Sequence, residues 1–341
     1  MTARRASVLV ALIAFGCEPG FSSSSIVSGL RVLALGFDKP EIRPGDTAMV
    51  QALIVDPAGG GRPLTTLWFA CGPAPLNGSS CDNGSNLLDL SGFLQLPGTR
   101  AIPAPPSYAA PANSLDGLSP ADQQRGGRDG QLVLAVGPGS VDQTLRGEGD
   151  RVVAVARIKV SLSPSPNQNP VATGLSVDGA DAPEGGVIEV AAGSAPAFEL
   201  RVGLEQSEVV PILDPGGPAE CTPVKGCTDP VLCPSLDCSR NQMCRVDLHP
   251  AVCEKHEELS VDWLSTAGEF SRTAAGGGVP DGGLPDEQGD LRVPRHVETF
   301  YLAPGGSGRD PIPADGMVTL WIVLRDDRYG VSWTTRRLHV H

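Results

Sequence analysis

The stretch VVAVARIKVSL, residues 152–162, alternates in side-chain type along its length. Its even-numbered positions are all apolar, whereas the odd-numbered ones include Arg157, Lys159 and Ser161. Successive side chains of a β-strand point to opposite faces, so a period of two predicts a strand with one buried face. This segment is the strongest strand signal in the first half of the chain.

Short alternating or apolar runs occur on both sides of this strand. They lie at 48–54, 67–71 and 131–136 before it, and at 198–204, 259–263, 299–302, 318–324 and 333–340 after it. One short helix is predicted at 119–124, where Ser119 can cap the helix N-terminus. The chain has 42 Gly and 32 Pro among its 341 residues, and many short strands between such turns predict an all-β fold made of β-sandwiches.

The segment SPSPNQNP, residues 163–170, has three prolines and no large apolar side chain. Such a stretch is typical of a linker, so we expect two domains, at 29–167 and 168–341. The first contains a long loop rich in Pro and Gly at 72–130. The second contains a cysteine-rich insertion at about 211–256.

The spacing of two tryptophans indicates that the two halves are related. Trp68 lies 20 residues after Ala48, and Trp263 lies 65 residues after Phe198, which becomes 19 when 211–256 is removed. On these features both halves resemble immunoglobulin-like (Ig-like) or PKD-like domains, in which a strand near the middle carries a core tryptophan. The resemblance implies two tandem Ig-like β-sandwich domains, the second with a disulfide-rich insertion. Neither half has the Cys–Trp–Cys spacing of antibody domains.

The first residues carry the features of an export signal. Arg4 and Arg5 precede an uncharged run at 6–16, which is too short to span the roughly 30 Å of a bilayer core as a helix. We therefore predict a signal peptide at 1–16.

The four residues AFGC, 14–17, resemble the lipobox of bacterial lipoproteins, in which the cysteine receives a lipid. The resemblance implies lipid attachment at Cys17, and Glu18 after it implies the outer membrane of a bacterial cell envelope. Four consecutive serines within 17–28 predict a flexible tether between the lipid and the fold. An ordinary signal peptidase could also cut before Cys17 and leave the cysteine unmodified.

The cysteine count fits this interpretation. Nine cysteines are present, and lipidation of Cys17 leaves eight, a number that can pair completely in an oxidising compartment. The six cysteines of the insertion lack the paired spacing of zinc ligands, so we expect disulfides and no metal site. The candidate disulfide residues are Cys71, Cys81, Cys221, Cys227, Cys233, Cys238, Cys244 and Cys253.

The charge limits the classes of partner. The formal net charge of −13 becomes −15 when Arg4 and Arg5 leave with the signal, which disfavours nucleic acid and anionic membrane surfaces. Contact with the membrane is expected only through the N-terminal lipid. The acidic pair Asp326 and Asp327 suits calcium, although turn residues with solvated charge are the favoured interpretation. Trp321 lies on the face opposite its apolar neighbours and is expected to be a partly exposed aromatic.

The sequence contains no recognisable catalytic motif. No nucleophile elbow precedes a helix, and no glycine loop is placed to bind phosphate. We therefore expect a non-enzymatic cell-envelope lipoprotein without a cofactor, a binding or spacer module for an envelope protein or a polysaccharide. The alternative is an envelope hydrolase with its site in the long loops, such as 72–130.

Overall fold

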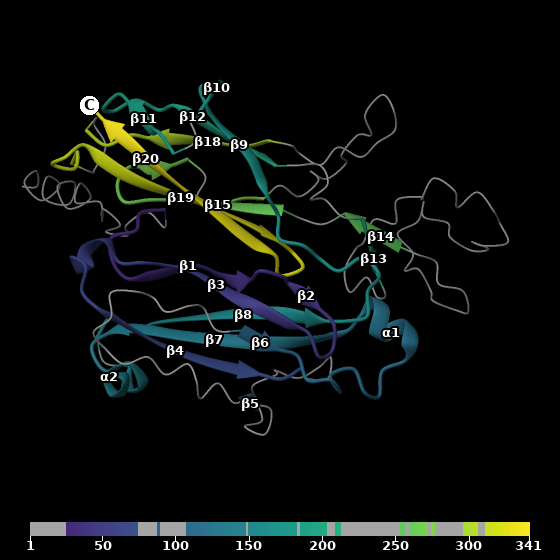
Figure 1. Cartoon of the computed structure of the whole chain (residues 1–341). Coiled ribbons are helices and arrows are strands. Elements are labelled where there is room, and N and C mark those ends of the chain that lie inside the picture. The colour runs from purple at the N-terminus through teal and green to yellow at the C-terminus, as the bar shows by residue number, and fades with distance from the viewer. Residues whose placement is uncertain are drawn as a thin grey trace, which may run out of the picture.

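The computed structural model describes most of the chain as an all-β protein (Figure 1). The described residues are 25–73, 87–88, 107–147, 149–182, 185–202, 209–212, 253–256, 259–271, 274–276, 296–305 and 311–341. Twenty strands and only short helices occur among them, which confirms the predicted fold class. No helix within these ranges is both long and apolar enough to cross a membrane.

The first half of the described chain forms a sandwich of two sheets. One sheet has the order β1-β3-β6, with bounds Arg31–Phe37, Thr47–Val55 and Ser107–Ala109. The other has the order β2-β8-β7-β4-β5, with bounds Glu41–Ile42, Val152–Val160, Arg128–Pro138, Leu64–Cys71 and Leu87–Leu88. Strand β2 runs parallel to β8, and the remaining pairs are antiparallel. Their inner faces enclose a core with Trp68, Leu134 and Ile158 at its centre.

The second half forms another sandwich. One sheet has the order β10-β9-β12-β18-β16, with bounds Ala180–Asp181, Ala172–Val177, Ala197–Val202, His296–Leu302 and Glu269–Phe270. The facing sheet has the order β11-β20-β19-β15-β17, with bounds Val187–Val190, Val331–Val340, Met317–Asp326, Leu259–Ser265 and Ala274–Gly276. The core between them contains an aromatic group formed by Phe198, Trp263, Phe270 and Tyr301.

The two sandwiches repeat one topology. The order β1-β3-β6 corresponds to β9-β12-β18, and β2-β8-β7-β4 corresponds to β11-β20-β19-β15. The pair β2-β8 and the pair β11-β20 are both parallel. Trp68 on β4 and Trp263 on β15 occupy matching strands and are 8% and 0% exposed, as the spacing predicted. The division of strands between the sheets is that of an Ig-like β-sandwich.

The short helices lie in the first sandwich. α1 (Pro120–Arg125) is capped by Ser119, whose hydroxyl accepts a hydrogen bond from the Asp122 amide at 3.2 Å, as predicted. α2 (Val141–Arg146) was not predicted, because six residues are too few to show a helical period; its N-terminus is fixed by a capping box of Ser140 and Gln143.

The insertion leaves the second sandwich between β12 and β15. Strand β13 (Val209–Ile212) pairs antiparallel with β14 (Cys253–His256), so the chain departs and returns side by side. The corresponding connection in the first sandwich, between β3 and β4, holds only the short 3-10 helix η1 (Pro57–Gly59).

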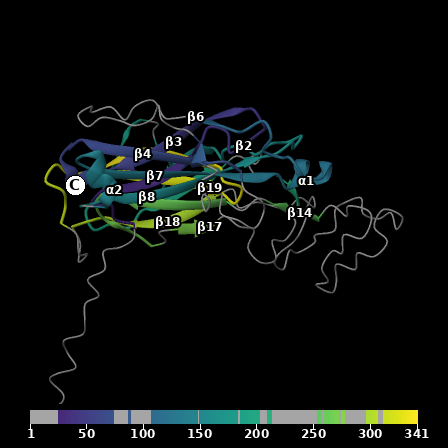
Figure 2. The same cartoon turned by 90° about the horizontal axis from the view of Figure 1, so that it is seen from below.

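A third apolar cluster joins the two sandwiches, and we call it the shared core. Strand β1 of the first sandwich lies against β20 of the second, and β19 contributes side chains to the same cluster (Figure 1). The first sandwich lies below the second in Figure 1, and Figure 2 gives the view from below. The buried members of the shared core are Val27, Leu33, Ala34, Trp321, Val323 and Val331. Trp321 is only 7% exposed, so the expectation of a partly exposed aromatic there is wrong. The outer face of β19 is covered by the other sandwich.

Polar contacts surround the shared core. Glu41 of β2 forms an ion pair with Arg328 at 2.6 Å, and its side chain is 2% exposed. The same carboxylate accepts hydrogen bonds from the Asn167 amide at 2.8 Å and from the Ser161 hydroxyl. Asn169 donates to the carbonyl of Phe37 at 2.7 Å. These bonds fasten the linker to both sandwiches.

Tyr329 adds a contact from the β19–β20 turn to β7. Its hydroxyl donates a hydrogen bond to Asp129 at 2.7 Å. Burial, followed by this hydrogen bond, raises the pKa of Tyr329 to about 12, so the phenol remains a donor even at a pH near the ordinary pKa of tyrosine.

Candidate functional site

The structure places few of the predicted site residues. Cys17, Cys81 and the insertion cysteines 221–244 lie outside the described residues, and so do 74–86 and 89–106 of the predicted loop 72–130. The described part of 72–130 is not all loop, because it contains β5, β6, α1 and the start of β7. Cys71, at the end of β4, is fully buried and disulfide-bonded. Cys253 begins β14.

The carboxylate of Asp326 structures the β19–β20 turn. It accepts hydrogen bonds from the amides of Gly330 at 2.6 Å and Arg328 at 2.8 Å, and from the Asn167 side chain at 3.2 Å. Burial raises its pKa, and these donors partly oppose that effect. The contacts favour the interpretation of Asp326 as a turn residue over that of a calcium ligand.

An open cavity of about 460 Å³ lies at one edge of the second sandwich, between β9 and β20. Leu338 and Val340 of β20 point into the core, so the period of two also places Ser332, Thr334 and Arg336 on the inner face. All three line the cavity, with apolar walls from Leu175, Leu200, Ile322 and Leu324. The inner face of β20 therefore changes from apolar to polar where it meets the cavity.

Two arginines border this cavity. Arg336 donates to the Thr334 hydroxyl at 2.6 Å and to the Thr335 carbonyl at 3.1 Å. Arg201 pairs with Asp181 and lies over Gly174, where an added Cβ would be 2.9 Å from its Nη2. The Nε atoms of both arginines are buried without a hydrogen-bond partner among the described residues. Both side chains line the cavity, so it presents two guanidinium groups to a bound molecule.

Strand edges are open on both sides of the cavity. β11 pairs with β20 only from Arg337 to Val340, which leaves 331–336 without a strand neighbour on that side in the described part of the chain. β10 pairs with β9 only at Ser176 and Val177, so 172–174 are likewise without a strand neighbour there. An open edge presents backbone donors and acceptors to an incoming strand.

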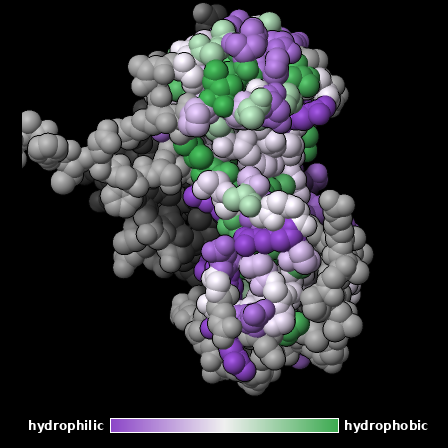
Figure 3. All heavy atoms as spheres, turned by 90° about the vertical axis from the view of Figure 1, so that its left-hand side faces the viewer, coloured by the Kyte–Doolittle hydropathy of each residue, from purple (hydrophilic) through white to green (hydrophobic). Residues whose placement is uncertain are grey.

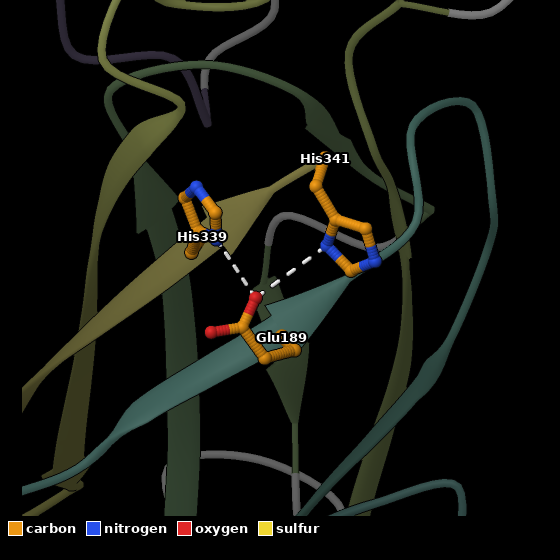
Figure 4. Close-up of side chains that lie close together, drawn as sticks. All are labelled: Glu189, His339 and His341. Carbon is orange, nitrogen blue, oxygen red and sulfur yellow. Dashed lines mark hydrogen bonds and ion pairs between the residues drawn. The ribbon is translucent and has the colours of Figure 1, made fainter.

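A second polar cluster lies where β11 pairs with the end of β20. Glu189 is opposite His339, and its Oε2 lies 2.8 Å from Nδ1 of His339 and 3.4 Å from Nδ1 of His341 (Figure 4). The two imidazole rings are stacked, with centroids 5.9 Å apart. The three donor atoms all lie within 4.8 Å of one another.

This cluster was missed in the sequence, where no metal site was expected. The pattern His-x-His on a strand places both rings on one face, which is a usable signal. Glu189 is 150 residues away from His339 and reaches it only through the parallel pairing of β11 with β20.

Figure 3, which views the side where the C-terminus lies, shows hydrophilic and hydrophobic residues interspersed on the upper sandwich.

Comparisons with known proteins assign no family. No family model and no curated protein matches the chain. Similar solved structures include a chimeric titin Z1Z2-Z1Z2 tandem, with 12% identity and a TM-score of 0.25 over 92% of this chain and 99% of that one. Tandem Ig repeats of Dlar have 10% identity and a TM-score of 0.22 over 92% and 99%. The Yersinia pseudotuberculosis adhesin InvE has 10% identity and a TM-score of 0.20 over 91% and 60%. At these scores the Ig-like description rests on the chain's own strand order.

Proposed function

We propose that the chain is a non-enzymatic, lipid-anchored protein of the bacterial cell envelope that binds an extended segment of an envelope protein at the cavity between β9 and β20. A polysaccharide is the other class of partner that the sequence allows. The observation that carries the proposal is the polar inner face of β20, formed by Ser332, Thr334 and Arg336.

The inner face of a sandwich is normally apolar, because burying polar groups without partners is unfavourable by about 1–3 kcal/mol each. Arg336 lies on that face with its Nε buried and without a partner in the described residues. A ligand carboxylate in the cavity would pair with the guanidinium of Arg336, and charge-assisted hydrogen bonds of this kind are the strong ones. The polar face is thus explained by an occupant that carries an acidic group.

The open edges favour a strand as the occupant. A peptide added alongside 331–336 would continue the β11-β20-β19 sheet through main-chain hydrogen bonds. Its alternate side chains would enter the cavity, where Leu200, Ile322 and Leu324 offer apolar contact and Arg336 offers charge. A polysaccharide could use the arginines but not the strand edge.

Arg336→Ala is expected to weaken binding of the partner about tenfold or more, since a hydrogen bond to a charged group contributes about 1.5–3 kcal/mol. Partners would be captured from envelope extracts by the mature chain, identified, and their affinities measured by calorimetry. Arg337→Ala is the matched control, because Arg337 is exposed on the opposite face of the same strand. Equal losses in both variants, or capture that neither changes, would contradict binding at the cavity.

Cys17→Ala is expected to move the protein from the detergent phase to the aqueous phase, because it removes the site of lipid attachment. Detergent partitioning followed by intact-mass measurement of the mature chain checks this. An unmodified Cys17 at the mature N-terminus of the wild-type protein would show that the ordinary signal peptidase cuts there.

The packing of the two sandwiches supports the role of a spacer. The shared core and the buried pair of Glu41 with Arg328 hold β1 and β2 against the β19–β20 hairpin. The predicted tether at 17–28 is too long at its end, because Ser25 and Val27 are buried and hydrogen-bond to Ser265 of the second sandwich. A flexible tether over 17–24, followed by a firmly packed pair of sandwiches, would hold the cavity at a distance from the membrane.

A further inference from the structure

We propose that Glu189, His339 and His341 bind a single divalent transition-metal ion, with zinc as the best-suited ion. Two imidazole nitrogens and one carboxylate oxygen form a donor set that zinc favours, and three protein ligands leave a position open for water. The cluster lies on the exposed side of β11 and β20, where water can occupy that position.

The distances fit an ion after a small adjustment. Zinc binds nitrogen and oxygen at about 2.0–2.2 Å, which places tetrahedral ligand atoms roughly 3.4 Å apart. The carboxylate oxygen of Glu189 is already 3.4 Å from His341 and 2.8 Å from His339. The three ligand atoms lie within 4.8 Å of one another, so any pair has to approach by at most about 1.4 Å to reach that spacing.

The backbone around the cluster is fixed by hydrogen bonds on both strands. Val187 to Val190 pair in register with Arg337 to Val340. Beyond this ladder, the His341 amide donates to the Val190 carbonyl at 3.2 Å, and the Ala192 amide donates to the His341 carbonyl at 2.8 Å. Ligands on paired strands lose little freedom when an ion binds, which favours affinity.

Gly316 leaves room for the ring of His339. Its φ is +68°, and an added Cβ would lie 2.9 Å from Cδ2 and 3.0 Å from Nε2 of that imidazole. A residue with a side chain at this position would push the ring away, so the glycine leaves the space that the ligand occupies.

A bound metal ion explains why both histidines point toward Glu189 better than salt bridges between these residues do. Both Nδ1 atoms point toward the same oxygen of Glu189 (Figure 4). Without an ion, each ring must carry a proton on Nδ1 to make a favourable contact with that oxygen. Exposed pairs of this kind contribute at most about 1 kcal/mol. Imidazoles that carry their proton on Nε2 instead present two Nδ1 lone pairs and a carboxylate oxygen to one point, which is the arrangement that a metal ion needs.

The test is a titration of zinc chloride into the full mature chain, purified without a histidine tag and under non-reducing conditions. We expect one bound zinc per chain by calorimetry, with a rise in the melting temperature and no competition from excess magnesium. Glu189→Gln and His341→Gln should each weaken binding by at least about tenfold, as loss of supporting groups alone already does in known sites.

Glu269→Gln is the matched control, since it removes one carboxylate from β16 in the other sheet. It should leave the zinc titration unchanged. Circular dichroism confirms that each variant is folded, and His341→Gln changes an exposed side chain that is not part of any core cluster. Absence of binding, or stoichiometric binding that both ligand variants retain, would overturn the proposal.

Discussion

Arg328→Met is expected to lower the free energy of unfolding by about 3–5 kcal/mol, because it leaves a carboxylate buried without its cation. The side chain of Glu41 is 2% exposed and pairs with Arg328 at 2.6 Å between the two sandwiches. The neutral donors to Glu41, from Ser161 and Asn167, cannot replace the lost charge. Urea unfolding at pH 7, followed by tryptophan fluorescence, measures the difference.

Arg337→Met is the control for this substitution, because Arg337 is exposed on β20 and should change the stability by less than about 0.5 kcal/mol. The double variant Glu41→Leu with Arg328→Met should recover much of the free energy of unfolding that Arg328→Met loses. Replacing both partners of a buried ion pair by apolar residues often leaves the stability unchanged. A loss below about 1 kcal/mol for Arg328→Met would show that the pair is solvated.

Trp321→Ala is expected to lower the free energy of unfolding by about 3–5 kcal/mol. It should also weaken the contact between the two sandwiches, so that they unfold separately. Trp321 is 7% exposed and lies in the shared core with Val323 and Val331. Its removal leaves a cavity between the sandwiches, so the linker at 163–170 should become a site of protease cleavage before either sandwich unfolds. Limited proteolysis with mass analysis of the fragments measures this.

Trp263→Ala removes the same side chain from inside the second sandwich, where Trp263 is 0% exposed. It should lower the free energy of unfolding about as much as Trp321→Ala does. The second sandwich should then unfold without early cleavage of the linker. If both variants give the same cleavage pattern, the shared core does not act separately from the core of the second sandwich.

Much of the fold could be predicted from local patterns. The alternation at 152–160 and the positions of Trp68 and Trp263 predicted strands and core residues that the structure confirms. The pattern fails after Val160, where Ser161 is buried and Leu162 is exposed. The shared core was missed, although the apolar run LWIVL at 320–324 gave a signal. A strand that is apolar on both faces is typical of one buried on both sides, as β19 is.

The candidate sites were harder to predict because distant residues form them. His339 and His341 share a face by their spacing, but only the register of β11 with β20 brings Glu189 to them. The cavity depends on where β11 and β10 stop pairing, and strand ends are the least regular part of the pattern. Five of the six insertion cysteines and Cys17 lie outside the described residues, so the disulfides of the insertion and the lipid at Cys17 stay predictions.

The parallel pairing of β11 with β20 has a mechanical consequence. Tension applied between the start of β11 and the end of β20 would draw the two strands past each other along their length. Four residue pairs, from Val187 opposite Arg337 to Val190 opposite Val340, would then resist in shear and have to break together, not one after another as in unzipping. The pairing of β2 with β8 has the same direction in the first sandwich. An ion held by Glu189, His339 and His341 would crosslink the two strands that bear this load.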